Sequence, residues 1–163
     1  MRIRDERPGD IIGIHALLDQ AFSGEPVGQL VDDLRSEDDL LLSLVAEVDG
    51  QIAGHIGFSP VAIAPCLARA VQLSPLAVAE PHRRQGIGAE LVRSGIDRCR
   101  VLDIDAILVL GDPHYYQRFG FDPSLAARLR SRWSGPHLMA LSLTNRTLSD
   151  CTFCSLAPAF ERM

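Results

Sequence analysis

The chain contains no lysine, because all 16 of its Lys and Arg positions are arginine. This absence excludes a phosphate loop of the G-K-[ST] type, a pyridoxal Schiff base, a lysine nucleophile and a biotinyl or lipoyl attachment site, since each needs a lysine amine. Positive charge is also scarce overall, and the net charge is −5 at pH 7. Nucleic-acid binding requires a basic surface that neutralises phosphates, so we expect no nucleic-acid partner.

Export and membrane signals are equally scarce. Residues 1–7 are charged and include no apolar segment of the signal-peptide kind. Residues 50–68 carry no Asp, Glu, Lys or Arg and approach the roughly 20 residues that a membrane helix needs. Gly54, Gly57, Pro60 and Pro65 interrupt this run, which predicts strands and turns rather than a helix. We therefore expect no membrane span and a cytoplasmic location.

The chain has only four cysteines, Cys66, Cys99, Cys151 and Cys154. Without an export signal, reduced thiols are expected rather than a disulfide framework. Cys151 and Cys154 have C-x-x-C spacing, but a zinc site needs a second ligand pair that the chain lacks, and a thioredoxin-like centre opens a helix where these flanks resemble strands. We expect two ordinary buried thiols and no metal; a thiol redox protein is the weakest functional alternative.

The length of 163 residues, with no repeat or linker, predicts a single domain over 1–163. Residues 125–133 fit both a helix and a strand, and this alternative stays open. Hydrophobic periodicity predicts strands at 2–5, 40–48, 51–63, 69–78, 106–110, 138–143 and 152–156, and helices at 11–22, 27–35, 86–102 and, in a shorter form, 113–120.

Two local signals indicate how these strands pair. Asp49-Gly50 is a strong hairpin signal, so the strands on either side of it are expected to be antiparallel. Pro75 lies within the predicted strand 69–78 and cannot donate to a ladder, which predicts a bulge and a locally splayed strand. The strand, helix and strand at 69–78, 86–102 and 106–110 predict a right-handed parallel crossover. The sheet is therefore expected to be mixed.

The turn that precedes the predicted helix 86–102 contains Gly86 and Gly88. Glycines at the start of a helix let a ligand approach the backbone, and the free N–H groups and the helix dipole favour an anion there. A dinucleotide fingerprint G-x-G-x-x-G needs a third glycine, where this chain has Leu91. The turn therefore predicts a phosphate or pyrophosphate site of another type.

These residues resemble a known family. The run R-R-Q-G-I-G at 83–88 resembles the R/Q-x-x-G-x-G/A acetyl-CoA signature of the GNAT superfamily of N-acetyltransferases, and V-A-E-P at 78–81 resembles the turn that ends that family's bulged strand. Downstream, the run G-D-P-H-Y-Y-Q-R-F-G-F at 111–121 resembles the family's Y-x-x-x-G-F segment in the form of the YhbS-type subgroup. The matched features extend from residue 2 to residue 121.

The resemblance implies an α/β (α+β) GNAT fold. Such a fold has a mixed, mostly antiparallel sheet, helices on both faces and a splayed parallel strand pair at the acetyl-CoA site. It also implies direct transfer of the acetyl group of acetyl-CoA to a small-molecule or peptide amine, with no metal and no covalent intermediate. An acyl-CoA-binding sensor or partner subunit of the same fold is the alternative. Whether the chain forms a homodimer stays open.

The resemblance also implies roles for individual residues. Tyr116 would protonate the departing thiolate, and the amide of Val78 would stabilise the oxyanion. The strand 69–78 offers only Gln72 and Ser74 where the family has a base, so the base is left among Glu80, Asp112, His114 and water. The acceptor pocket is expected from residues 22–30 and the terminal strands. The implied cofactor-binding residues are Leu76, Ala77, Val78, Arg83, Arg84, Gln85, Gly86, Ile87, Gly88 and Ala89.

Overall fold

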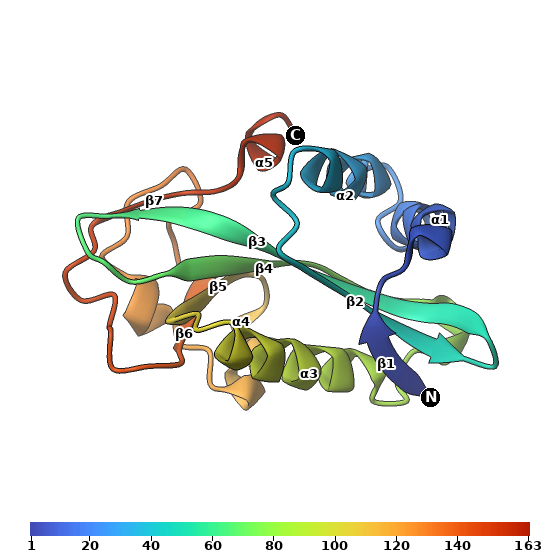
Figure 1. Cartoon of the computed structure of the whole chain (residues 1–163). Coiled ribbons are helices and arrows are strands. Elements are labelled where there is room, and N and C mark those ends of the chain that lie inside the picture. Colours follow the sequence, from blue (N-terminus) through green and yellow to red (C-terminus); the bar gives the residue numbers. More distant parts are fainter.

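A seven-stranded mixed sheet forms the centre of the computed structural model, which describes residues 1–163 (Figure 1). Six strands lie in the order β1-β2-β3-β4-β5-β6, and β7 pairs with the far end of β3. Every pair is antiparallel except β4 and β5. The strands are β1 (Arg2–Asp5), β2 (Leu42–Val48), β3 (Gln51–Ala64), β4 (Ala70–Val78), β5 (Ala106–Leu110), β6 (Leu138–Ser142) and β7 (Phe153–Ser155).

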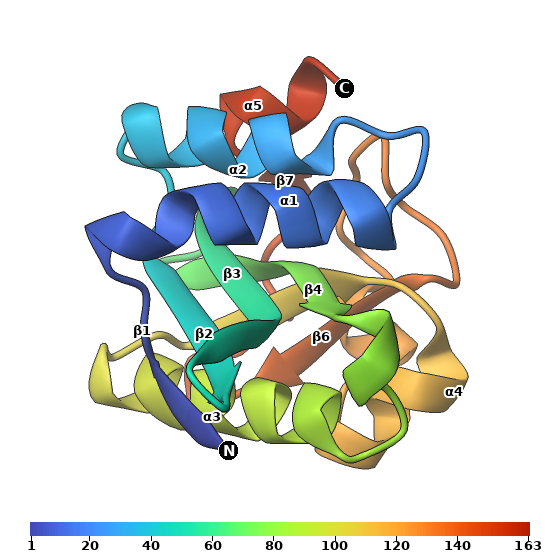
Figure 2. The ribbon, with the colours of Figure 1, turned by 90° about the vertical axis from the view of Figure 1, so that its right-hand side faces the viewer.

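Helices cover both faces of this sheet, as Figure 2 shows. On one face lie α1 (Ile11–Ala21), α2 (Val27–Ser36) and the short α5 (Pro158–Glu161). On the other face lie α3 (Ile87–Val101) and the short α4 (Pro113–Tyr116). Single 3-10 turns occupy Pro8–Asp10, Glu80–His82, Gln117–Phe119 and Pro123–Ala126. None of the helices has the length and apolar character needed to cross a bilayer.

The hairpin that Asp49-Gly50 predicts is present. Asp49 and Gly50 adopt positive φ angles of 50° and 75° between β2 and β3, as a tight hairpin turn requires. Helix α3 packs its apolar stripe on the sheet so closely that a Cβ atom on Gly95 would lie 2.4 Å from the Phe58 ring.

Residues 125–133, whose sequence fitted both a helix and a strand, form neither. They contain only the end of a 3-10 turn and an isolated bridge between Arg130 and Phe153.

Strand β4 pairs with β3 from Ala70 to its last residue, Val78, but with β5 only from Ala70 to Leu73. The β3–β4 register shifts between Ile56 and Phe58, at the level of Ser74 and Pro75. Gly57 fits there because a Cβ atom would lie 3.0 Å from the Ser74 carbonyl oxygen. Proline supplies no N–H, so the ladder cannot continue regularly past it. The predicted irregularity is confirmed, and β4 and β5 are unpaired beyond Leu73.

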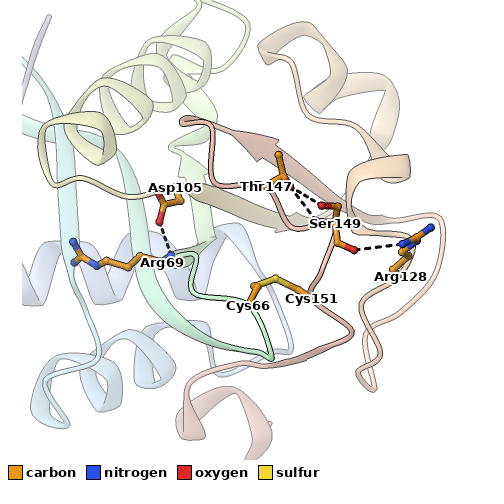
Figure 3. The surroundings of a disulfide bond; sticks show 7 residues. All are labelled: Cys66, Arg69, Asp105, Arg128, Thr147, Ser149 and Cys151. Atoms are coloured by element: carbon orange, nitrogen blue, oxygen red, sulfur yellow. Dashed lines mark hydrogen bonds between the residues drawn. A yellow bond between two sulfur atoms is a disulfide. The ribbon is translucent and has the colours of Figure 1, made fainter.

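The cysteines correct one prediction, because Cys66 and Cys151 form a disulfide rather than remaining reduced (Figure 3). Their Cα atoms are 5.1 Å apart, within the usual disulfide range. The partners are 85 residues apart in sequence and meet because β7 pairs with the end of β3. Cys154, the other member of the C-x-x-C spacing, is a buried free thiol, as is Cys99. The C-x-x-C spacing of Cys151 and Cys154 therefore did not indicate that Cys151 pairs with Cys66.

A polar network joins α2 to the sheet beneath it. Arg35 donates to both oxygens of Glu6, at 2.7 and 3.1 Å, and Ser43 donates to the same carboxylate. The Ser43 Oγ atom also lies 2.8 Å from Nε2 of His55, which is fully buried and whose Nδ1 atom has no partner. Burial lowers the pKa of His55 to about 4. His55 is therefore neutral in the folded protein at pH 5 to 7.

We predict that His55 makes the fold sensitive to acid. Unfolded histidine takes up a proton below about pH 6.5, whereas folded His55 does so only below about 4, so the unfolded state gains more protons as the pH falls. Between pH 7 and pH 5 this group should lower the free energy of unfolding by about 2 kcal/mol. Urea unfolding at both pH values measures this. His55→Gln should remove that part of the pH dependence, and His114→Gln, at an exposed position, should keep it.

We predict that the disulfide stabilises the fold by closing a long loop. Replacing Cys66 and Cys151 together by Ser should lower the free energy of unfolding by about 2–4 kcal/mol, because the unfolded chain regains conformational entropy. Urea unfolding with and without a thiol reductant tests this. The reductant should lower the stability of the unmodified protein to that of the double variant and leave the variant unchanged. A reductant without effect on the unmodified protein would contradict the prediction.

Candidate active site

The first part of the site is the turn between β4 and α3. Gly86 precedes α3 with φ of +83°, and a Cβ atom there would meet nothing within 4 Å, so the backbone is open to a ligand. A Cβ atom on Gly88 would lie 3.2 Å from the Tyr115 hydroxyl. A cavity of about 320 Å³ opens over this turn. Its lining includes seven of the predicted residues, namely Val78, Arg83, Arg84, Gly86, Ile87, Gly88 and Ala89.

Three further residues line this cavity that sequence reasoning had not assigned: His82, Tyr115 and Arg118. The Arg118 guanidinium lies 4.6 Å from the centre of the Tyr115 ring. Arg118 belongs to the same G-D-P-H-Y-Y-Q-R-F-G-F run as the tyrosines, so that run already contained it without indicating its position. With Arg83 and Arg84, it makes the cavity rich in cations, as a pyrophosphate requires.

The second part of the site is the open edge of β4. Ala79 donates its N–H to the Ala53 carbonyl at 2.8 Å, and successive residues of a strand point their main-chain groups to opposite sides. Leu76 and Val78 therefore direct theirs away from β3, toward the side where pairing with β5 has ended. Arg83 donates through Nε to the Val78 carbonyl oxygen at 2.9 Å. This contact does not involve the Val78 N–H, which stays available to a ligand.

The other predicted cofactor residues are placed differently. Ala77 directs its main chain toward β3, and its side chain is buried in the cluster that packs under α1. Ile87 is 4% exposed, so that it can offer a ligand its backbone but little of its side chain. Gln85 lies in the turn, with Nε2 donating to the Pro81 carbonyl at 3.3 Å. These residues shape the turn and the strand beneath a ligand.

The two adjacent tyrosines point into different cavities. Tyr115 lines the cavity over the α3 turn, as described above. Tyr116 packs on Gly111, where a Cβ atom would lie 2.7 Å from the Tyr116 ring, and lines a second, larger cavity. Burial raises the pKa of Tyr116 to about 12. Tyr116 thus keeps its proton at every physiological pH, so its hydroxyl is available as a hydrogen-bond donor, while the raised pKa makes it a weaker acid than a free tyrosine.

The larger cavity has a volume of about 520 Å³ and lies where β4 and β5 separate. Its walls come from the α1–α2 connection, β4, the end of β5 and the carboxyl-terminal region, which includes the 22–30 segment expected from the sequence. Trp133 and Phe160 complete the walls, and no spacing in the sequence had assigned them there. The lining of this cavity includes Phe22, Glu25, Gln72, Tyr116, Trp133 and Phe160.

None of the candidate bases reaches this cavity. Glu80 lines a separate hollow beside α1, and His114 is exposed. Asp112 accepts a hydrogen bond from the His114 N–H at 2.9 Å and so caps α4. Glu25 is the one acidic side chain in the lining, at an exposed position. The structure therefore places none of Glu80, Asp112 and His114 in the lining of this cavity, although the Asp112 carbonyl accepts the Tyr116 N–H at 3.1 Å. No group of three or more His, Cys, Asp or Glu side chains forms a metal-type cluster.

A glycine turn at a helix start, an open strand edge and a cavity containing a protonated tyrosine are the features expected of a coenzyme A-dependent acyltransferase. Comparison with known proteins identifies the family. The chain belongs to the acetyltransferase (GNAT) family, whose sequence model matches residues 11–121. The expected family, fold class and N-acetyltransferase activity class are thereby confirmed.

Individual relatives agree with this membership. The uncharacterized N-acetyltransferase YhbS of Escherichia coli K12 is 43% identical over 136 residues, which cover 83% of this chain and 81% of YhbS. The crystal structure of E. coli YhbS in complex with CoA has a TM-score of 0.92 and 37% identity, covering 99% of this chain and 92% of YhbS. A GNAT family acetyltransferase from Brucella melitensis in complex with acetyl-CoA has a TM-score of 0.82 and 33% identity, covering 98% and 97%.

Proposed function

We propose that this chain transfers the acetyl group of acetyl-CoA directly to an amine bound in the 520 Å³ cavity. The observation that carries the proposal is the unpaired edge of β4. Val78 lines the cavity over the α3 turn, and Leu76 lines the cavity with Tyr116, so this edge connects the two. The CoA and acetyl-CoA complexes of the two similar structures support this cofactor.

The chain offers each part of the cofactor a matching group. The backbone amides of residues 85–89 would hold the pyrophosphate at the start of α3, and Arg83, Arg84 and Arg118 would supply positive charge. The pantetheine arm would lie along β4 like an added strand and pair with the free main-chain groups of Leu76, and the Val78 N–H would face the thioester oxygen at the end of this arm. The absence of a Cβ atom at Gly88 keeps space for the phosphates beside Tyr115.

The proposed acetyl transfer uses the acceptor amine, the Val78 N–H and the Tyr116 hydroxyl. The amine lone pair attacks the thioester carbonyl carbon, and the Val78 N–H stabilises the negative charge on the carbonyl oxygen. The C–S bond then breaks, and the departing thiolate takes the proton of Tyr116. The proton released by the amine would leave through water, because Glu80, Asp112 and His114 lie outside the cavity, and water would return a proton to Tyr116.

One observation favours a second candidate function. Strand β4 has Gln72 rather than a carboxylate in the cavity, which suits an acyl-CoA-binding sensor with little turnover. Release of free thiol in the presence of an amine separates the two functions, since a sensor binds acetyl-CoA without releasing thiol.

We further propose that the protein acts as a single domain in the cytoplasm, where acetyl-CoA is made and used, without nucleic-acid or membrane partners. Homodimer formation is open to measurement by sedimentation.

We predict that Gly88→Val weakens acetyl-CoA binding by about 2 kcal/mol or more, because the new side chain obstructs the backbone amides that hold the pyrophosphate. Calorimetric titration of the folded variant measures this. Gly9→Val is a matched control, since a Cβ atom at Gly9 meets nothing within 4 Å and lies away from the site. Unchanged affinity in Gly88→Val would place the pyrophosphate elsewhere.

We predict that Tyr116→Phe lowers kcat by roughly 100-fold while acetyl-CoA affinity changes little, because the hydroxyl acts only as the thiolate leaves. Tyr115→Phe is the matched control. Its hydroxyl faces the Gly88 turn, so we expect it to weaken acetyl-CoA binding with a milder effect on kcat. Steady-state kinetics and calorimetry on both variants measure these effects. An equal or larger loss of kcat in Tyr115→Phe would move the acid by one residue.

A further inference from the structure

Glu25 is the one charged side chain in the lining of the larger cavity, where every other side chain is neutral. It belongs to the connection between α1 and α2 and is exposed, so a ligand in the cavity can reach it. Its carboxylate takes part in none of the ion pairs of the protein. The cavity therefore carries one negative charge with which no cation of the protein pairs.

The backbone holds Glu25 in place before any ligand arrives. The Phe22 carbonyl accepts the Glu25 N–H at 3.0 Å, and the Glu25 carbonyl accepts the Val27 N–H at 2.9 Å. Asp19, near the end of α1, accepts the Gly28 N–H, near the start of α2, at 3.2 Å. These contacts fix the turn that carries the carboxylate, so its pairing with a ligand requires little reordering of the backbone.

The composition of the lining determines which charge an acceptor can bring into the cavity. An anionic group would find no arginine or histidine there, and Glu25 would repel it. A cationic group would find the Glu25 carboxylate, and an ion pair beside apolar walls is weakened less by water than a pair on an open surface. The lining therefore selects for a positive charge on the acceptor.

This positive charge differs from that of the reacting amine. The reacting amine attacks through its lone pair and must first lose a proton, whereas a neighbouring carboxylate favours the protonated ammonium form. The two positions also belong to different walls. The thioester would lie beside Leu76 and Val78 in the sheet, and Glu25 belongs to the connection between two helices that cover one face of the sheet (Figure 2). Glu25 therefore matches a second charge, on a part of the acceptor that does not react.

We propose that the acceptor is a diamine with an apolar spacer and no carboxylate, in which one amine takes the acetyl group and the other, as an ammonium group, binds Glu25. The proposal rests on the acetyl transfer proposed above and names the substrate class of that same site. One carboxylate matches one ammonium group, and apolar side chains of the lining, such as Phe22, Leu30 and Phe160, match the spacer. Glu25 is a specificity-determining residue in this proposal.

Matched amines test the proposal. 1,5-Diaminopentane carries the second ammonium group, pentylamine lacks it, and 6-aminohexanoate has a carboxylate in its place. The corresponding sets built on 1,3-diaminopropane and 1,7-diaminoheptane cover shorter and longer spacers. In the set with the best spacer, thiol release from acetyl-CoA should give a kcat/KM for the diamine about 10-fold above that for the monoamine, with the amino acid poorest. Equal kcat/KM for diamine and monoamine in every set, or preference for an amino acid, would overturn the proposal.

Variants assign the preference to the charge of Glu25. Glu25→Gln keeps the size of the side chain and should reduce the diamine-to-monoamine ratio to the small statistical factor that two equivalent amines give, with acetyl-CoA affinity unchanged. Glu25→Arg reverses the charge and should make the amino acid a better acceptor than the diamine. Asp97→Asn is the control, because it removes an equal charge from an exposed position on α3 and should keep the full ratio. A ratio that persists in Glu25→Gln would overturn the proposal.

Calorimetry separates this proposal from the one on which it rests. If acetyl-CoA does not bind, the proposed acetyl transfer fails, and the substrate class fails with it. If acetyl-CoA binds, the diamine should bind the complex of the protein with CoA more tightly than the monoamine does, and Glu25→Gln should abolish the difference. The difference should also shrink as the salt concentration rises, because ions screen an exposed pair. Acetyl-CoA binding with equal affinity for diamine and monoamine would refute the substrate class and leave the proposed transfer intact.

Discussion

The separation of β4 from β5 is the constraint on which the site depends. Strand β4 is held by β3 on one side, so it cannot move away as β5 leaves it on the other. Pro75 and the register shift opposite it lie just beyond the last pair of the β4–β5 ladder, where a regular ladder cannot continue. The result is a strand edge that β5 does not pair, where Arg83 binds the Val78 carbonyl and the remaining main-chain groups lie beside the two cavities.

Charge is distributed unevenly around this edge. The salt-bridged network of Glu6, Arg35 and Asp32 lies where α2 meets the sheet, and arginines gather over the α3 turn where a pyrophosphate would lie. The larger cavity, by contrast, is lined by apolar and neutral side chains apart from Glu25. A cavity of this kind strengthens each hydrogen bond formed inside it and penalises each unpaired group.

The carboxyl-terminal region contributes to the site although it follows the family's matched segment at residues 11–121. Phe160 and Leu156 form part of the larger cavity, and β7 connects them to the end of β3. The Cys66–Cys151 disulfide fixes the same junction covalently (Figure 3). Disulfides are rare in reducing compartments, so the proposed cytoplasmic location would favour the reduced pair. In that state the β3–β7 ladder and the packing of α5 against α2 would hold these walls of the cavity.

The hairpin at Asp49-Gly50, the irregular strand at Pro75 and the glycine turn before α3 could be predicted from the sequence, because each depends on local backbone chemistry. Contacts between distant segments could not, and they include the placement of Tyr115 and Tyr116 in different cavities. Cys66 meets Cys151, and Tyr116 and Phe160 line the same cavity, only because distant segments pack together. Such contacts depend on strand order and register over the whole sheet, and no spacing within a single segment records them.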